Sequence, residues 1–261
     1  MQASVPPTVL IIAGNDPSGG AGLAADIQAV TALGAHPAPV VTAVTVQDTV
    51  NVRRVELMSP DLVTAQAQAV LDDQPVAAIK LGLLGRSAIA AAVADLLAAR
   101  RGIPLVVDPV LVAGGGGTLA ETDIVEIYLQ RLFPLADLIT PNALESRRLV
   151  PDADTPAARA AALLRTGCRH VLLKGADEET PDVCNILFGA GTESELFRWP
   201  RLPGSYHGSG CTLASAIAAL LAQGNTMRDA VAHAQQFTWD ALDQGWRPGK
   251  GQLIPARRSV P

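Results

Sequence analysis

The first 127 residues of the chain contain no phenylalanine, tyrosine or tryptophan. All nine aromatic residues lie at or after Tyr128, although 49% of the chain is hydrophobic. The core of the first half must therefore be built from valine, leucine, isoleucine and alanine. Buried parallel strands covered by alanine-rich helices have this composition, because such strands bury both of their faces. The aromatic deficit thus predicts a layered α/β fold.

Short apolar runs of strand length alternate with longer helical patterns along the chain. Strands are expected at residues 9–13, 40–46, 52–57, 77–82, 105–108, 138–140 and 170–174, with an edge hairpin at 183–188 and 195–199. Helices are expected up to about residue 33, after Ser59, and at 87–99, 122–132, 155–164, 211–222 and 227–244. This order predicts a mostly parallel central sheet with helices on both faces, a three-layer αβα sandwich formed by a single domain over residues 1–261.

Charge and composition argue against several classes of protein. The formal net charge is −5 and the pI is about 5.3, whereas nucleic-acid binding usually needs a basic surface with stacking aromatics. No apolar run reaches the ~18 residues of a membrane span, and the first residues lack the basic and apolar regions of a signal peptide. The cysteines, Cys168, Cys184 and Cys211, lack the spacing of metal ligands, so we expect a reduced, cytoplasmic setting.

A glycine-rich segment, GNDPSGGAG at residues 14–22, leaves the first expected strand and enters a helix. Glycines let the backbone approach a ligand, and a helix N-terminus offers unpaired N–H donors. Two interpretations stay open: a ligand-binding turn, or a tight turn with a capping Asp or Ser. Residues 20–25 fit the G-x-G-x-x-A pattern of dinucleotide-binding turns, whereas no Walker A sequence occurs. Asp26 is either an acid that complements the helix dipole or a carboxylate near a ligand.

A second glycine-rich segment, HGSGCT at residues 207–212, directly precedes an apolar helix. Its backbone N–H groups from Gly208 to Gly210 would converge with the helix N-terminus into an anion hole suited to a phosphoryl group. Cys211 falls in the first turn, where the helix field is expected to lower the pKa of its thiol. The alternative is a small buried cysteine after a flexible loop. His207 has no second ligand at helical spacing and is a poor metal candidate.

Polar residues stand where several expected strands end. Asp108, Asn142 and Glu145 form an oxygen-rich set suited to Mg²⁺ held largely through water, although Asn142 and Glu145 would equally form a helix capping box. Lys174 either meets nucleotide phosphates or extends its stem along the strand end. Gln47 could form hydrogen bonds in both directions with the edge of a heterocycle.

Seven segments of the chain together resemble the hydroxymethylpyrimidine/phosphomethylpyrimidine kinases of thiamine biosynthesis, which have the ribokinase-like fold. The segments are AGNDPSGGAGLAAD (13–26), TAVTVQDT (42–49), IKLGLLG (79–85), VVDPVLVA (106–113), LITPNALE (138–145), VLLKG (171–175) and HGSGCTLASAIAA (207–219). They extend the resemblance from about residue 9 to residue 254. Cys211, in place of the aspartate of most ribokinase-like enzymes, points to the pyrimidine-kinase branch or the related pyridoxal-kinase branch.

The resemblance implies transfer of the ATP γ-phosphate to the hydroxymethyl group of 4-amino-5-hydroxymethyl-2-methylpyrimidine (HMP), and a second transfer onto the monophosphate. The implied pyrimidine contacts are Gly14, Asp26, Gln47 and Leu83. The implied nucleotide and Mg²⁺ region contains Asp108, Asn142, Glu145 and Lys174, with Asp108 and Glu145 holding the metal largely through water. The implied anion hole consists of Gly208, Ser209 and Gly210, with Cys211 at the position of the catalytic base. A homodimer is also implied. Because the implied pyrimidine contacts precede Tyr128, an aromatic side chain that stacks on the ring would come from the second half of the chain or from a neighbouring subunit, or there is none.

The chain departs from the family pattern at several positions, and one departure lies in a loop. Gly114 and Gly117 replace a lysine and an aspartate, and the four consecutive glycines predict a mobile lid. Three other functions stay open: a pyridoxal kinase that uses the same site, a dinucleotide-dependent oxidoreductase that uses the turn at Gly20, and a ligand sensor without catalysis.

Overall fold

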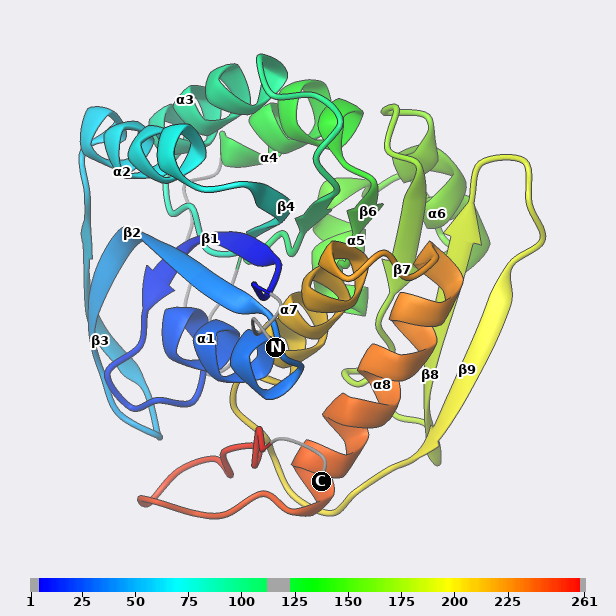
Figure 1. Ribbon diagram of the computed structural model, residues 1–261. Coiled ribbons are helices and arrows are strands. Elements are labelled where there is room, and N and C mark those ends of the chain that lie inside the picture. The colour runs from blue at the N-terminus through cyan, green and yellow to red at the C-terminus, as the bar shows by residue number, and fades with distance from the viewer. Residues whose placement is uncertain (1–4, 112–122, 259–261) are drawn as a thin grey trace.

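The computed structural model describes residues 5–111 and 123–258, so the glycine loop at 114–117 lies outside the described residues. Its centre is one nine-stranded sheet of order β3-β2-β1-β4-β5-β6-β7-β8-β9 (Figure 1). The strands are β1 (Thr8–Asn15), β2 (His36–Gln47), β3 (Val52–Leu57), β4 (Val76–Leu81), β5 (Leu105–Val107), β6 (Leu138–Ile139), β7 (His170–Leu173), β8 (Asp182–Gly189) and β9 (Glu195–Pro200).

The strands from β2 through β7 in this order run parallel to one another. Strand β3 is antiparallel to β2 at one edge, and the hairpin of β8 and β9 is antiparallel at the other. The mostly parallel sheet and the edge hairpin that the sequence predicts are both confirmed. Because parallel strands end on the same side, the segments that follow β1, β2, β4, β5 and β7 meet at one edge of the sheet.

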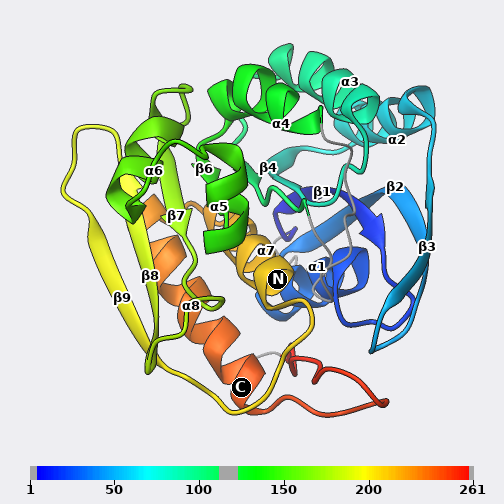
Figure 2. The same ribbon diagram turned by 180° about the vertical axis from the view of Figure 1, so that it is seen from behind.

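Helices cover both faces of the sheet (Figures 1 and 2). One face carries α1 (Gly22–Ala32), α7 (Ser209–Ala222) and α8 (Met227–Asp243). The other carries α2 (Pro60–Asp73), α3 (Ser87–Ala98), α4 (Ile124–Ile127), α5 (Ala143–Leu149) and α6 (Pro156–Leu164). Alternate residues of β1 enter the two cores: Val9 and Ile11 pack on the first face, and Leu10 and Ile12 on the second. None of the described helices is long and apolar enough to cross a membrane.

The helix expected at residues 122–132 differs from the observed structure. Within the described residues, α4 ends at Ile127 and continues as a π-helical turn (Tyr128–Leu132) and a 3₁₀ turn (Phe133–Leu135). The wider and then tighter turns bury the rings of Tyr128 and Phe133, which stack with centroids 5.6 Å apart. Pro134 has no N–H group, so a regular α-helix cannot run through it undisturbed.

Candidate active site

A cavity of about 200 Å³ lies at the edge of the sheet where the parallel strands end. It is lined by residues at or just after the ends of β1, β2, β4, β5, β6 and β7, and by the turn before α7 and the start of that helix. The structure brings to its wall all the site residues predicted from the sequence except Asp26, namely Gly14, Gln47, Leu83, Asp108, Asn142, Glu145, Lys174, Gly208, Ser209, Gly210 and Cys211. One aromatic side chain, Tyr206, also lines the cavity, and it comes from the second half of the chain.

The turn before α7 has a backbone that only glycine fits. Gly208 has φ of 78°, and a Cβ atom on it would lie 2.0 Å from the carbonyl oxygen of Gly20. Helix α7 begins at the next residue, so the N–H groups of its first turn lie at the cavity without helical partners. A Cβ on Gly210 would lie 3.0 Å from Nζ of Lys174. An ammonium group and a helix N-terminus therefore meet at one place, which suits an anion.

Lys174 is held in the cavity by Asp108. Its Nζ donates to Oδ1 of Asp108 at 2.8 Å, and the hydroxyl of Thr140 donates to the same oxygen at 3.0 Å. Burial disfavours the charge on Asp108, but Lys174 and Lys80 outweigh it and hold the pKa of this carboxyl below its ordinary value. Burial likewise disfavours the charge on Lys174, while Asp108 and Glu145 raise its pKa above the ordinary value. Both groups are therefore charged at neutral pH.

Asn142 and Glu145 form the capping box of α5, one of the two interpretations left open by the sequence. The Asn142 side chain accepts from the N–H of Glu145 at 2.7 Å, and the Glu145 carboxylate accepts from the N–H of Asn142 at 2.9 Å. Burial raises the pKa of Glu145 to about 7, because Lys174 compensates only in part and Asp108 adds repulsion. In the described part of the chain, no group of three or more His, Cys, Asp and Glu side chains could hold a metal ion.

Asp26 lies beneath the cavity instead of on its wall. It is fully buried, and both of its carboxylate oxygens lie 2.8 Å from Nζ of Lys80, which is also fully buried and lines the cavity. The Ser215 hydroxyl donates to Asp26 as well, at 2.7 Å. Burial alone would lower the pKa of Lys80, but Asp26 outweighs it and raises this pKa. Burial also raises the pKa of Asp26 itself, because the opposing effects of Lys80 and Ser215 do not outweigh it.

The expectation that the Cys211 thiol has a lowered pKa is wrong. Burial raises the pKa of this thiol to about 11, and the opposing effect of Lys80 does not compensate. The N–H of Gly22 donates to the sulfur atom. The field of a helix N-terminus favours a thiolate, but the cost of burying an anion is larger here. Cys211 is therefore a neutral thiol at pH 7.

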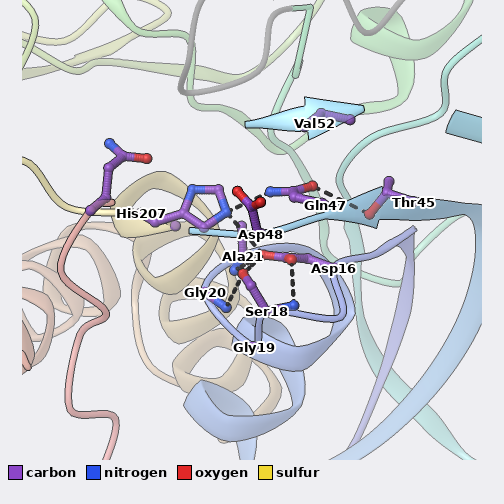
Figure 3. A network of polar contacts seen from close by, with 12 residues as sticks. Asp16, Ser18, Gly19, Gly20, Ala21, Thr45, Gln47, Asp48, Val52 and His207 are labelled. Carbon is purple, nitrogen blue, oxygen red and sulfur yellow. Dashed lines mark hydrogen bonds and ion pairs between the residues drawn. The ribbon is translucent and has the colours of Figure 1, made fainter. Parts of the chain in front are cut away.

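The carboxylate of Asp16 closes the first glycine-rich turn. This agrees with the interpretation of that segment as a tight turn held by an aspartate. The Asp16 carboxylate accepts from the N–H groups of Ser18 and Ala21, each at 2.8 Å, and from the Ser18 hydroxyl at 3.0 Å. Oδ2 of Asp16 also lies 2.9 Å from Nε2 of His207, which in turn contacts the Gln47 amide (Figure 3). The two glycine-rich turns are thus joined at the cavity by one polar network.

Arg257 forms hydrogen bonds to both glycine-rich segments, on the side away from the cavity lining. Its guanidinium donates to the Gly20 carbonyl at 2.5 Å and to the Thr212 hydroxyl at 2.7 Å, and its side chain is buried. Sequence reasoning missed Arg257 and Lys80. The sequence does carry a signal for Lys80: it stands inside the apolar run AIKLGLL, and a lysine in such a run is rarely buried without a partner of opposite charge.

Proteins of one known family resemble this chain along most of its length. The family model for phosphomethylpyrimidine kinase matches residues 16–255. The hydroxymethylpyrimidine/phosphomethylpyrimidine kinase of Mycobacterium tuberculosis is 42% identical over 94% of this chain and 92% of its own length. The thiamine biosynthesis bifunctional protein ThiED of Geobacter sulfurreducens is 41% identical over 94% of this chain, which spans about half (51%) of that longer protein.

Two solved structures show the same fold. The pyridoxal kinase of Staphylococcus aureus, solved in complex with AMP-PCP and pyridoxal, matches with a TM-score of 0.88 and 27% identity over 97% of this chain and 94% of its own. The phosphomethylpyrimidine kinase of Clostridium difficile matches with a TM-score of 0.78 and 31% identity over 91% of this chain and 99% of its own. The family match and the full-length relatives together establish that the chain belongs to the phosphomethylpyrimidine kinase family.

Proposed function

We propose that this protein transfers the γ-phosphate of ATP to the hydroxymethyl group of HMP, and then transfers a second phosphate to the resulting monophosphate, for thiamine biosynthesis. One observation carries the proposal: a single cavity holds the anion-binding turn at Gly208 and Lys174 together with the amide of Gln47. The chain spans over nine-tenths of its single-function relatives, which bear the name of this activity, and about half of the bifunctional ones.

The pyrimidine would lie at the end of the cavity formed by Gly14, Gln47 and Leu83. Gly14 leaves room for Leu83, since a Cβ on Gly14 would lie 3.1 Å from Cδ2 of that leucine. The flat aliphatic surface and the amide offer one apolar contact and one polar edge, and Tyr206 supplies an aromatic ring nearby. These features suit a small polar heterocycle better than a sugar, whose hydroxyl groups need more hydrogen-bond partners.

Phosphoryl transfer depends on positioning and charge stabilisation more than on a strong base. The N–H groups at the start of α7 and the ammonium of Lys174 would stabilise the charge on the transferring phosphoryl group. The neutral thiol of Cys211 would orient the attacking alcohol in the first transfer, and the proton of the alcohol would pass to an oxygen of the transferred phosphate as the bond to ADP breaks. In the second transfer the attacking oxygen belongs to a phosphate and is already ionised at neutral pH, so it needs no base.

Mg²⁺ forms part of this proposal. Two of the three carboxylates at the cavity, Asp108 and Glu145, match the way proteins usually hold Mg²⁺, with few protein ligands supplemented by water and substrate phosphates. When bound, the metal would neutralise charge on the ATP phosphates. Asn142 would then hold Glu145 in place through the capping box.

Product analysis tests the proposal directly. The protein is incubated with ATP, Mg²⁺ and HMP, and the products are separated over time. We expect the monophosphate to appear first and the diphosphate afterwards. Formation of the monophosphate alone would restrict the protein to the first transfer, and formation of neither product would overturn the proposal.

Pyridoxal phosphorylation is a second candidate, because the S. aureus pyridoxal kinase shares the fold over nearly the whole chain. Turnover measured side by side with pyridoxal and HMP separates the two substrates. ATP-dependent phosphorylation of either compound would exclude a ligand sensor without catalysis. Binding of NAD without phosphoryl transfer would instead support the dinucleotide interpretation. That interpretation gives the anion-binding turn at Gly208 no role.

We further propose that the protein acts in the cytoplasm as a homodimer of single kinase domains. The continuous sheet from β3 to β9 supports one domain, and Cys168, Cys184 and Cys211 are all free thiols, as a reducing compartment favours. Light scattering during size-exclusion chromatography would test the dimer.

A further inference from the structure

Helix α8 packs against the edge hairpin of β8 and β9 (Figure 1), and a pair of buried amides joins the two. Asn185 of β8 and Gln235 of α8 are 7% and 3% exposed, and Nδ2 of Asn185 donates to Oε1 of Gln235 at 2.8 Å. Leu187 and Phe197, on the same face of the hairpin, belong to the apolar core around them. Two amides in such a layer cost free energy unless each finds its hydrogen-bond partners.

The orientation of both amides is fixed by groups that can act in only one way. The N–H of Gly175 can only donate, and Oδ1 of Asn185 accepts from it at 3.0 Å. The indole N–H of Trp199 can only donate, and Oε1 of Gln235 accepts from it at 3.1 Å. The carbonyl of Val231 can only accept, and Nε2 of Gln235 donates to it at 3.2 Å. Asn185 is therefore held with its oxygen toward Gly175 and its nitrogen toward Gln235.

Gly175 follows the point where the ladder between β7 and β8 ends. The last backbone pair of that ladder joins Leu173 to Ile186. The buried N–H of Gly175 then takes the Asn185 side chain as its acceptor. A Cβ atom on Gly175 would lie 2.2 Å from the carbonyl oxygen of Cys184, so this segment lies directly against β8. Without the side chain of Asn185, a buried backbone N–H would lose its partner.

Lys174 directly precedes Gly175, and its backbone is held on both sides. On one side, its N–H donates to the carbonyl of Pro141 at 3.0 Å. On the other side, the peptide group that joins it to Gly175 donates its N–H to Asn185. These contacts set the position from which the Lys174 side chain reaches Asp108 and the anion turn.

We propose that Asn185 is a positioning residue, which fixes through the N–H of Gly175 the backbone from which Lys174 presents its ammonium to the transferring phosphoryl group. The inference rests on the proposed function, since it takes Lys174 as a phosphate contact. Gln235 in turn holds the Asn185 amide, so α8 helps to place a charge in a cavity that it does not line. A displacement of about 1 Å at a reacting group can cost about a hundredfold in rate.

The test measures kcat and the KM for HMP in variants of Asn185. Asn185→Leu removes the acceptor and should lower kcat by about tenfold or more. The KM for HMP should stay unchanged, because the end of the cavity proposed for the pyrimidine does not include this strand. Asn185→Asp keeps an oxygen toward Gly175 but loses the amide donor toward Gln235. It should therefore retain most of kcat while its midpoint of urea unfolding falls.

Thr238→Val is the matched control. Thr238 is a buried residue of α8, and its hydroxyl donates to the carbonyl of Ala234 within the helix at 2.7 Å. The variant removes a buried hydrogen bond on the helix that carries Gln235 but leaves the contact between Asn185 and Gly175 in place. It should lower the urea midpoint and leave kcat unchanged. Equal losses of kcat in Thr238→Val and Asn185→Leu would mean that general loosening of α8 causes both, and would overturn the inference.

A double-mutant cycle shows whether Asn185 acts through Lys174. In a Lys174→Met background, Asn185→Leu should lower kcat no further. A further loss there, a wild-type kcat in Asn185→Leu alone, or a loss in Asn185→Asp as large as in Asn185→Leu would contradict the inference. If the rate of Lys174→Met is too low to measure, the affinity for a non-hydrolysable ATP analogue, measured by calorimetry, replaces kcat in the cycle. If Asn185→Leu does not fold, Asn185→Ser shortens the side chain away from Gly175 and should lower kcat in the same direction.

The two levels of proposal fail in different ways. A wild-type protein that does not phosphorylate HMP contradicts the proposed function. An active wild-type protein whose kcat survives Asn185→Leu contradicts only the role of Asn185.

Discussion

Two lysines of the cavity, the fully buried Lys80 and the partly buried Lys174, are each paired with one aspartate. Lys174 faces Asp108 beside the anion turn, and Lys80 faces Asp26 beneath it. A phosphate that enters beside Gly210 competes with Asp108 for Lys174, so we expect the carboxylate to become available to a cation when the nucleotide binds. The pairs thus hold the charges in place before the substrate arrives, which lowers the cost of reorganisation during the reaction.

At the position of Cys211, alanine should impair the first phosphoryl transfer more than the second. The neutral thiol can orient the alcohol in the first step, whereas the acceptor in the second step is already an anion. Separate assays with HMP and with its monophosphate measure the two rates. Equal losses in both assays would show that Cys211 serves only the shape of the turn.

The buried carboxyl of Glu145 should make the unfolding free energy depend on pH. Its pKa is about 7 in the folded protein, against an ordinary value of 4.5, so the folded state holds a proton that the unfolded chain releases. The stabilisation is complete below about pH 4.5 and is lost as pH rises through 7, by about 3 kcal/mol in total.

Urea unfolding at several pH values measures this effect. Glu145→Gln should remove the pH-dependent contribution of this carboxyl to the unfolding free energy. The difference in unfolding free energy between the variant and the wild type should therefore change steadily from pH 5 to pH 8. A difference that does not vary with pH would mean that Glu145 is already ionised in the folded protein.

Among the elements, the turn before α7 is the most sensitive to added side-chain atoms. Gly208→Ala places a methyl group against the Gly20 carbonyl and strains a backbone with positive φ, so it should displace the anion turn and lower kcat strongly. Gly224→Ala is a matched control: Gly224 has φ of 86° but open space around it. The control should lose only about 1–2 kcal/mol of stability from backbone strain and keep its kcat.

Assays of kcat and denaturant unfolding on both variants separate strain from displacement. If the two variants lose kcat equally, the loss in Gly208→Ala comes from backbone strain at positive φ and not from contact of the new methyl group with Gly20.

The regular elements could be predicted from sequence because their signals are local. The strands and the edge hairpin follow apolar runs, and the helix that begins after Ser59 starts with a cap and a proline, as observed. The predicted helix at 122–132 was wrong in part, because burial of Tyr128 and Phe133 decides the shape of that segment. The pKa of Cys211 was wrong for a related reason: the helix field is visible in the sequence, but the depth of burial is not.

The polar network at the cavity could not be predicted in the same way. Gln47 and His207 are 160 residues apart and Asp16 and His207 are 191 apart, so no local pattern connects them. The residue types at strand ends indicated which side chains reach the cavity. The partners that each of them chooses depend on how the two glycine-rich turns pack together.

At the scale of the whole molecule, Arg257 braces the two glycine-rich turns against each other. Arg257→Met should lower the stability by about 2 kcal/mol or more, because buried carbonyl and hydroxyl groups lose a charged donor. It should also raise the KM for ATP and for HMP, since both turns line the cavity. Arg258→Met is the matched control, because that neighbouring side chain is exposed.

Urea unfolding and steady-state kinetics on these two variants provide the comparison. Loss of stability with unchanged KM values would make Arg257 a support of the fold alone.

The bracing of distant turns also bears on the order of events during folding. Hydrogen bonds at the cavity and just behind it join residues separated by 160 to 237 positions along the chain. Contacts of such long sequence separation form late, because the loop between them must first lose its conformational freedom. Partly folded forms with a completed sheet would therefore still lack a working cavity. The gain of nucleotide binding during refolding should lag behind the gain of helical signal, and it would mark the moment at which the native state is complete.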